Sequence, residues 1–118
     1  MGKVLVVGAG LAGSEAANYL ASKGVPVVLA EVKRLKLGPA QKIPDFGELV
    51  CTNSLKSKDP NSGHGLLKVE MKAFNSLVLS AAEVHAVPAG DALAVDRDNF
   101  AAEITKRLSE NELIEVID

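Results

Sequence analysis

The chain has 118 residues, a formal charge of −2 at neutral pH, and 47% hydrophobic and 24% charged residues, which is the composition of one ordinary globular domain. A single cysteine excludes an internal disulfide, and two histidines with that one cysteine offer no spacing for a His/Cys metal cluster. The balanced charge excludes a histone-like basic module, and no apolar run reaches the roughly 18 residues of a membrane span, so we expect a reduced, cytoplasmic setting without membrane or metal.

The first part of the chain predicts a strand, a helix and a second strand. Residues 3–7 form a β-branched apolar run typical of a buried parallel strand, and a glycine-rich turn follows at once. Apolar residues then recur with helical spacing over residues 11–23. Residues 25–31 are apolar again and end in a carboxylate. This order predicts a right-handed βαβ unit over residues 1–31.

The segment 32–62 is rich in Gly and Pro and is locally basic. Between positions 33 and 58 six cations face two acids, an excess of four charges that leaves the rest of the chain about six units negative. The cations are Lys33, Arg34, Lys36, Lys42, Lys56 and Lys58, and the acids are Asp45 and Glu48. Such a loop would attract RNA phosphates, with an affinity that falls as salt rises. A solvated loop without a partner is an equally good interpretation.

Regular patterns return over residues 63–118. Helical spacing at 66–84 is interrupted at Asn75 and Ser76, which predicts two shorter helices. There follow a turn at 87–90, a short strand at 92–95, a helix capped by Asp96 with Phe100, Ile104 and Leu108 on one face, and a last strand at 113–117. The alternation of strands and helices predicts a doubly wound α/β domain with a parallel sheet. Because the pattern ends in a strand without a closing helix, we expect an incomplete domain of a longer protein.

The most informative motif is the turn formed by Gly8, Ala9, Gly10, Leu11, Ala12 and Gly13. A helix N-terminus offers unpaired N–H groups and a positive dipole end, so it binds an anion where no side chain blocks the approach. Gly8 permits the tight turn, Gly10 the approach of a pyrophosphate, and Gly13 close packing of the helix. Glu31 ends the second strand, where a carboxylate accepts hydrogen bonds from an unphosphorylated ribose. The motif predicts a Rossmann-like site for FAD or NAD, and the alternative is a glycine cluster used only for packing, with Glu31 a solvated strand end.

Longer stretches resemble a known family. Residues 7–17 resemble the start of the glucose-inhibited-division group of flavoproteins, which modify tRNA. Residues 48–57 (ELVCTNSLKS), 65–71 (GLLKVEM) and 87–98 (VPAGDALAVDRD) resemble, more specifically, the folate- and FAD-dependent tRNA uracil-5 methyltransferases. The resemblance runs in register through nearly the whole chain.

This resemblance implies an enzyme several times longer than the chain. Such an enzyme takes a one-carbon unit from methylenetetrahydrofolate, uses FAD with NAD(P)H as co-substrate, and places a methyl group on carbon 5 of a T-loop uridine in tRNA. It also implies that the turn at residues 8–13 holds the FAD pyrophosphate and that Glu31 holds the adenosine ribose. Cys51 is by this likeness the catalytic residue, a redox-active or nucleophilic thiol beside the flavin. The family pattern has a second functional cysteine, so we expect the isolated segment, with Cys51 alone, to be inactive.

Elementary chemistry supports a cysteine in such a reaction. Carbon 5 of uracil is a poor nucleophile until a group adds to carbon 6, and a thiolate is well suited to do so. Lys42, Lys56, Lys58 or a helix start near residues 53–54 would favour the thiolate of Cys51. The alternative interpretation is that Cys51 is a small buried hydrophobic residue.

Rival functions remain open from the sequence. One is the related carboxymethylaminomethyl-uridine flavoprotein or a plain NAD- or FAD-dependent oxidoreductase, and another is a nucleotide-binding module without catalysis. His64 and His85 have no evident partner. Glu15 lies near the positive end of the first helix, where an acid is stabilising. Asp96 is expected to cap a helix, although a strand end of an open sheet also faces the ligand side.

Overall fold

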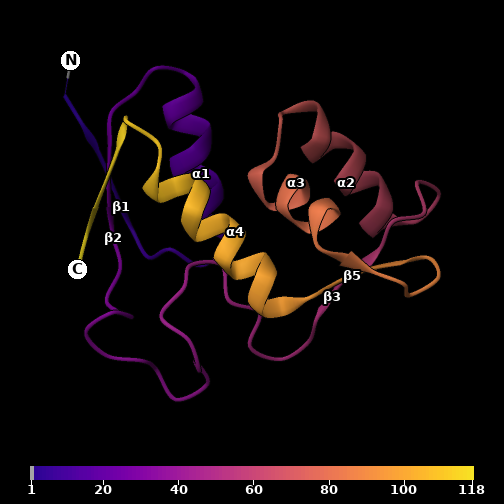
Figure 1. Ribbon diagram of the computed structural model, residues 1–118. Helices are drawn as coiled ribbons and strands as arrows, with labels where there is room; N and C mark the ends of the chain where they lie inside the picture. Colours follow the sequence, from indigo (N-terminus) through magenta and orange to yellow (C-terminus); the bar gives the residue numbers. More distant parts are fainter. Residues whose placement is uncertain (1) are drawn as a thin grey trace.

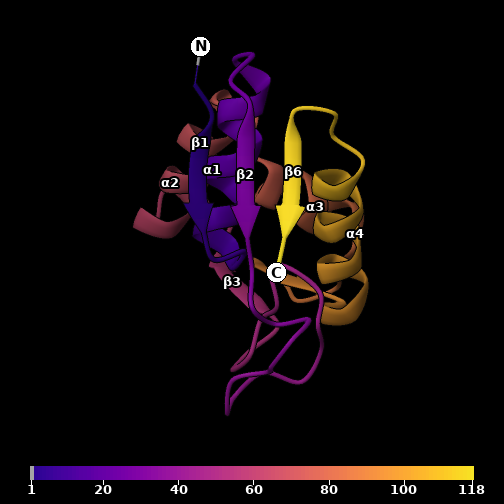
Figure 2. The same cartoon turned by 90° about the vertical axis from the view of Figure 1, so that its left-hand side faces the viewer.

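A three-stranded parallel sheet forms one face of the protein in the computed structural model, which describes residues 2–118 (Figures 1 and 2). Its strands are β1 (Val4–Val7), β2 (Val27–Ala30) and β6 (Ile114–Ile117), in the order β1-β2-β6. Because β2 lies between its neighbours, one register joins Val4, Val27 and Ile114 across the sheet. The predicted α/β class, the parallel sheet and the opening βαβ unit are confirmed.

A second, antiparallel sheet contains β3 (Ser54–Ser57), β5 (Ala92–Val95) and the short β4 (Ala86–Val87), in the order β3-β5-β4. Strand β5 was predicted, but its place is in this separate sheet and not beside the parallel strands. Strands β3 and β4 were not predicted, because β3 is polar and β4 has only two residues. Lys56, with a φ of 71°, interrupts the pairing of β3, where the register shifts between Ser54 and Ser57.

The four helices are α1 (Leu11–Ser22), α2 (Gly63–Ala73), α3 (Leu77–Val84) and α4 (Arg97–Ser109). Side chains cap the last three, because Ser62, Ser76 and Asp96 each accept a hydrogen bond from a backbone N–H three residues on. The predicted break between α2 and α3 is confirmed, and Asn75 adopts a φ of 59° there. Among residues 2–118, none of the helices combines the length and apolar character needed to cross a bilayer.

The core lies between the parallel sheet and the helices α1 and α4, and α3 packs on the other side of these helices (Figure 1). Phe100, Ile104 and Leu108, which the sequence placed on one face of α4, are fully buried. Phe46, from the loop before β3, joins the same core, and its N–H donates to Thr105 Oγ1 at 2.8 Å. The loop is therefore packed onto α4.

The opposite face of the parallel sheet carries no helix among the described residues (Figure 2). Leu5 is 61% exposed and Val7 is 78% exposed on this face, and Ile117 is exposed as well. Parallel sheets ordinarily bury both faces under helices. The described part of the chain thus covers one face of a doubly wound arrangement.

Candidate functional site

The glycine turn connects β1 directly to α1. Gly8 has a φ of 96°, which a residue with a side chain rarely adopts, and its N–H donates to Ala30 O at 2.7 Å. A Cβ on Gly13 would overlap the carbonyl oxygen of Gly8. The turn therefore requires glycine at both positions, and it brings the start of α1 against the carboxyl end of the sheet.

The N-terminus of α1 is open and has no side-chain cap, in contrast to the other three helices among the described residues. The first helical bond runs from Ser14 N to Gly10 O at 3.0 Å, so the amides of Leu11, Ala12 and Gly13 precede it. A Cβ on Gly10 would meet no heavy atom within 4 Å. The protein's own packing thus does not need glycine at this position, and the free space lies where an anion would approach the amides.

Glu31, which follows β2, is hydrogen-bonded to this turn. Its Oε1 accepts a hydrogen bond from Ala9 N at 2.8 Å, and its Oε2 accepts one from Lys33 N at 3.0 Å. The residue is only 9% exposed. Each carboxylate oxygen keeps a second lone-pair site for another donor, such as a ribose hydroxyl. The Ala9 amide is already paired, so an anion at the turn would meet the amides of Leu11, Ala12 and Gly13.

The basic loop is partly neutralised inside the fold. Lys33 Nζ donates to Glu48 Oε1 at 2.8 Å and to Asp45 O at 2.6 Å, and the Lys33 and Glu48 side chains are only 4% and 10% exposed. Burial raises the pKa of Glu48, but hydrogen bonds from Lys33 and from the N–H of Lys42, with the charge of Lys33, bring that pKa below its ordinary value. Lys33 is therefore not among the cations that this loop exposes.

Other cations of this loop differ in their pairing. Arg34 pairs with Asp118 at 2.8 Å on the surface. Exposed cations that remain are Lys36, Lys42, Lys56 and Lys58. The loop also contacts the glycine turn, because Gly47 N donates to Ala9 O at 2.8 Å. Sequence reasoning missed this contact, since nothing local to Gly47 marks its partner.

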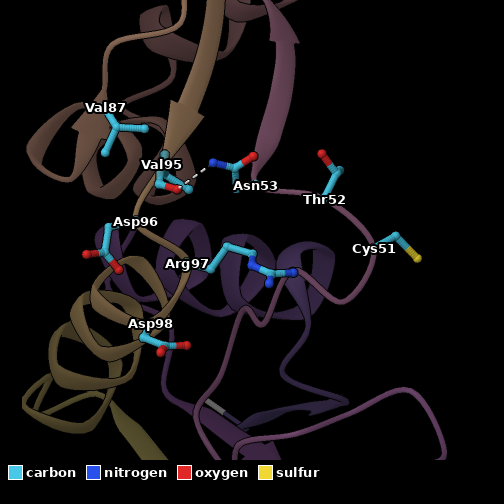
Figure 3. Close-up of a pocket in the computed structure, with 8 residues that line it drawn as sticks. All are labelled: Cys51, Thr52, Asn53, Val87, Val95, Asp96, Arg97 and Asp98. Atoms are coloured by element: carbon cyan, nitrogen blue, oxygen red, sulfur yellow. Dashed lines mark hydrogen bonds between the residues drawn. The ribbon is translucent and has the colours of Figure 1, made fainter.

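Cys51 lies on the rim of a pocket of about 670 Å³ (Figure 3). The lining residues are Cys51, Thr52, Asn53, Val87, Val95, Asp96, Arg97 and Asp98. Cys51 is free and exposed, so the interpretation as a buried hydrophobic residue is wrong. The helix start suggested near residues 53–54 is also wrong, because β3 begins there. Lys42, Lys56 and Lys58 do not line the pocket, and its cation is Arg97.

Glu15 and Asp96 both act at helix starts. Glu15 Oε2 accepts a hydrogen bond from Leu77 N at 2.7 Å, and Oε1 accepts one from the hydroxyl of Ser76, so this carboxylate of α1 caps α3 and not its own helix. Asp96 caps α4 as predicted, by accepting from Asn99 N at 3.2 Å.

Neither histidine belongs to a metal cluster among residues 2–118, where no group of three potential His, Cys, Asp or Glu ligands occurs. His85 Nε2 lies 3.2 Å from Glu103 Oε1. Hydrogen bonds from Arg107 and then from His85 hold the pKa of Glu103 below its ordinary value. The cluster of His85, Glu103 and Arg107 links α3 to α4, so its role is structural.

The geometry agrees with the comparison of the chain with known proteins. The family model described as "Glucose inhibited division protein A" matches residues 3–118. The chain belongs to this family. Its fold is accordingly the Rossmann-like α/β domain that the turn and the parallel sheet display.

Three similar curated proteins share one name. The chain is 54% identical over 114 residues to the methylenetetrahydrofolate–tRNA-(uracil-5-)-methyltransferase TrmFO of Acholeplasma laidlawii, with 97% of this chain and 27% of the relative covered. It is 55% identical over 115 residues to the TrmFO of Caldicellulosiruptor bescii, with 98% and 26% covered. The TrmFO of Desulfotalea psychrophila is 53% identical over 116 residues, with 98% and 26% covered. The chain thus spans about a quarter of the length of the relatives it matches.

Proposed function

We propose that this chain is the FAD-binding part of an enzyme that methylates carbon 5 of a T-loop uridine in tRNA, with methylenetetrahydrofolate as the one-carbon donor. The observation that carries the proposal is the uncapped start of α1, with open space at Gly10 in front of its first amides. The names of the relatives support the donor, the acceptor and the reaction.

The residues present fit a dinucleotide with an unphosphorylated ribose. The amides of Leu11, Ala12 and Gly13 would hold the pyrophosphate through hydrogen bonds and the helix dipole. Glu31 would accept hydrogen bonds from the ribose hydroxyls while it keeps its bonds to the turn. When bound, FAD supplies the redox chemistry that takes a methylene-level carbon to a methyl group. We propose NAD(P)H as the co-substrate that supplies the electron pair.

Cys51 would act on the uracil ring. Addition of its thiolate to carbon 6 forms an S–C6 bond and moves the C5–C6 π electrons to carbon 5, which makes carbon 5 nucleophilic. After carbon 5 has accepted the one-carbon unit, loss of its proton and departure of the sulfur restore the ring. Because the thiol is exposed beside a polar pocket of about 670 Å³, there is room for the uracil ring to reach the sulfur. The free thiol also suits the reducing cytoplasm, where we place the protein.

Flavin retention tests the binding part of the proposal. In the protein at its native length, Gly10→Val fills the space in front of the amides and should abolish retention of FAD, with the far-ultraviolet circular dichroism unchanged. Gly63→Val is the matched control, since Gly63 starts α2 and a Cβ there also meets no atom within 4 Å. A yellow Gly10→Val protein with bound FAD would contradict the proposed site.

Methyl incorporation tests the catalytic part. Cys51→Ser should abolish transfer to T-loop uridine, because a serine hydroxyl at neutral pH is a far weaker nucleophile than a thiolate. FAD should remain bound, since the groups proposed to hold it are the amides of the glycine turn and the Glu31 carboxylate. Normal methylation by this variant would show that the thiol is not the nucleophile.

A further inference from the structure

The segment that carries Cys51 is fastened to the junction between β5 and α4. We call residues 49–53 the Cys51 segment. At its far end, Asn53 O accepts a hydrogen bond from Val95 N at 2.9 Å, and Asn53 Nδ2 donates to Val95 O at 3.3 Å. At its near end, Arg97 Nη1 donates to Leu49 O at 3.4 Å. The thiol therefore lies between two anchors that both come from the same strand–helix junction.

The Arg97 side chain makes one of these two attachments, and its partner Leu49 is distant in sequence. Arg97 is the first residue of α4, and in Figure 3 its guanidinium extends from the helix toward the Cys51 segment, whereas the sulfur of Cys51 points away from α4. The guanidinium thus contacts the backbone of the segment and not the thiol. The guanidinium therefore affects Cys51 by holding the backbone of the segment and by placing a positive charge on the pocket wall.

Arg97 is not held in a contact ion pair by the two acids that line the same pocket, Asp96 and Asp98. Among residues 2–118, the ion pairs within 4.0 Å do not include Arg97, although Asp96 and Asp98 flank it in sequence. The carboxylate of Asp96 instead accepts hydrogen bonds from the backbone and side chain of Asn99. A guanidinium has five N–H donors and only one is used here. Arg97 is therefore a cation with spare donors on the wall of the pocket that Cys51 borders.

We propose that Arg97 is a positioning residue for Cys51: it fixes the Cys51 segment against α4 and keeps a positive charge beside the pocket into which a substrate must come. The proposal rests on the proposed role of Cys51 as a reacting thiol. Arg97 acts through its hydrogen bond to the backbone at Leu49, while Asn53 and Val95 supply the second anchor.

Alkylation of the thiol in the protein at its native length tests the electrostatic part, with peptide mapping by mass spectrometry so that only the labelling of Cys51 is counted. The rate with anionic iodoacetate is divided by the rate with neutral iodoacetamide, and in this ratio the thiolate fraction cancels. A sphere of this volume is about 11 Å across, and a unit charge at that distance in water changes the local concentration of an anion about twofold. Arg97→Met should lower the ratio about twofold at low salt and leave it unchanged at about 1 M salt, where screening is complete within a few ångströms.

Amide hydrogen exchange tests the positional part. Loss of the bond to Leu49 should raise exchange several-fold at the Val95 amide, whose hydrogen bond to Asn53 O holds the other end of the Cys51 segment. The rise is expected in both Arg97→Met and Arg97→Lys, because an ammonium on a flexible stem does not reproduce the guanidinium contact. Arg97→Lys keeps the charge and should keep the alkylation ratio. Arg34→Met is the control, since it removes a surface cation that pairs with Asp118 elsewhere.

The outcomes separate this proposal from the cofactor proposal. If Arg97→Met and Arg34→Met give the same alkylation ratio and the same exchange, Arg97 does not position the segment. A lower melting temperature with equal acceleration of both reagents would assign Arg97 a purely structural role and would also overturn the proposal. Neither measurement needs flavin, so failure of FAD binding in the Gly10→Val experiment leaves these results interpretable.

Discussion

Replacement of Glu15 by alanine should destabilise the protein at helix α3. Ser76 and Leu77, which contact Glu15 at the start of α3, lie 61 and 62 positions after it in the sequence. The Glu15 carboxylate accepts hydrogen bonds from Leu77 N at 2.7 Å, from Val78 N at 3.4 Å and from the Ser76 hydroxyl. In the alanine variant the Leu77 amide loses its partner at the start of a helix whose first residues are buried. The link between α1 and α3 then depends on apolar packing alone.

The size of the effect follows from these contacts. Hydrogen bonds to a charged group contribute about 1.5–3 kcal/mol, and an acid at a helix N-terminus adds a further fraction, so a loss of about 2 kcal/mol is expected for this partly exposed site. At roughly 2.1 cal/mol/K of unfolding entropy per residue, a cooperative unit of these 118 residues loses about 4 °C of melting temperature per kcal/mol, hence about 8 °C in all.

Thermal unfolding followed by circular dichroism measures this shift. Glu15→Gln keeps an acceptor oxygen and should lose about half as much as Glu15→Ala. Glu83→Ala is the control, because Glu83 lies on α3 and pairs with Lys72 at 3.4 Å on the exposed surface, where ion pairs contribute little. If Glu15→Ala lowers the melting temperature no more than Glu83→Ala does, the reasoning about the α3 cap is refuted.

Three further changes have defined outcomes. Gly13→Ala should leave too little folded protein for a cooperative thermal transition, because its Cβ would overlap a backbone oxygen of the turn, and a near-native melting temperature would show that the turn can open. The lowered pKa of Glu48 contributes stability that is complete above the unfolded value of about 4.5 and is lost as the pH falls through the lower folded value. Glu48→Gln should therefore flatten the decline of the unfolding free energy on acidification below about pH 4.5. An unchanged slope would contradict the role of the pair with Lys33. Replacement of both Lys56 and Lys58 by alanine should weaken tRNA binding more at low salt than at high salt and reduce the salt slope, and an equal slope would remove these lysines from an RNA surface.

The sequence alone determined the local elements and the glycine turn. Apolar spacing is a property of neighbours along the chain, so it located β1, α1 and β2, the break before α3 and the buried face of α4. The glycines of the turn were readable for the same reason, since strand, turn and helix are consecutive. The polar strand β3 was missed because its stability comes from pairing with β5, and pairing partners distant in sequence leave no local pattern.

Only the tertiary structure decided which charges are free and which residues surround Cys51. Lys33 reads as a surface cation, but Glu48 lies fifteen residues further on and its carboxylate lets the ammonium be buried. Glu15 reads as a dipole partner of its own helix, yet the fold directs it to α3. Lysines close in sequence were the expected cations near Cys51, whereas Arg97, which donates a hydrogen bond over forty-eight residues to Leu49, is the one that lines its pocket. Side-chain hydrogen bonds act over a few ångströms of space, and folding, not chain order, sets which groups come within that range.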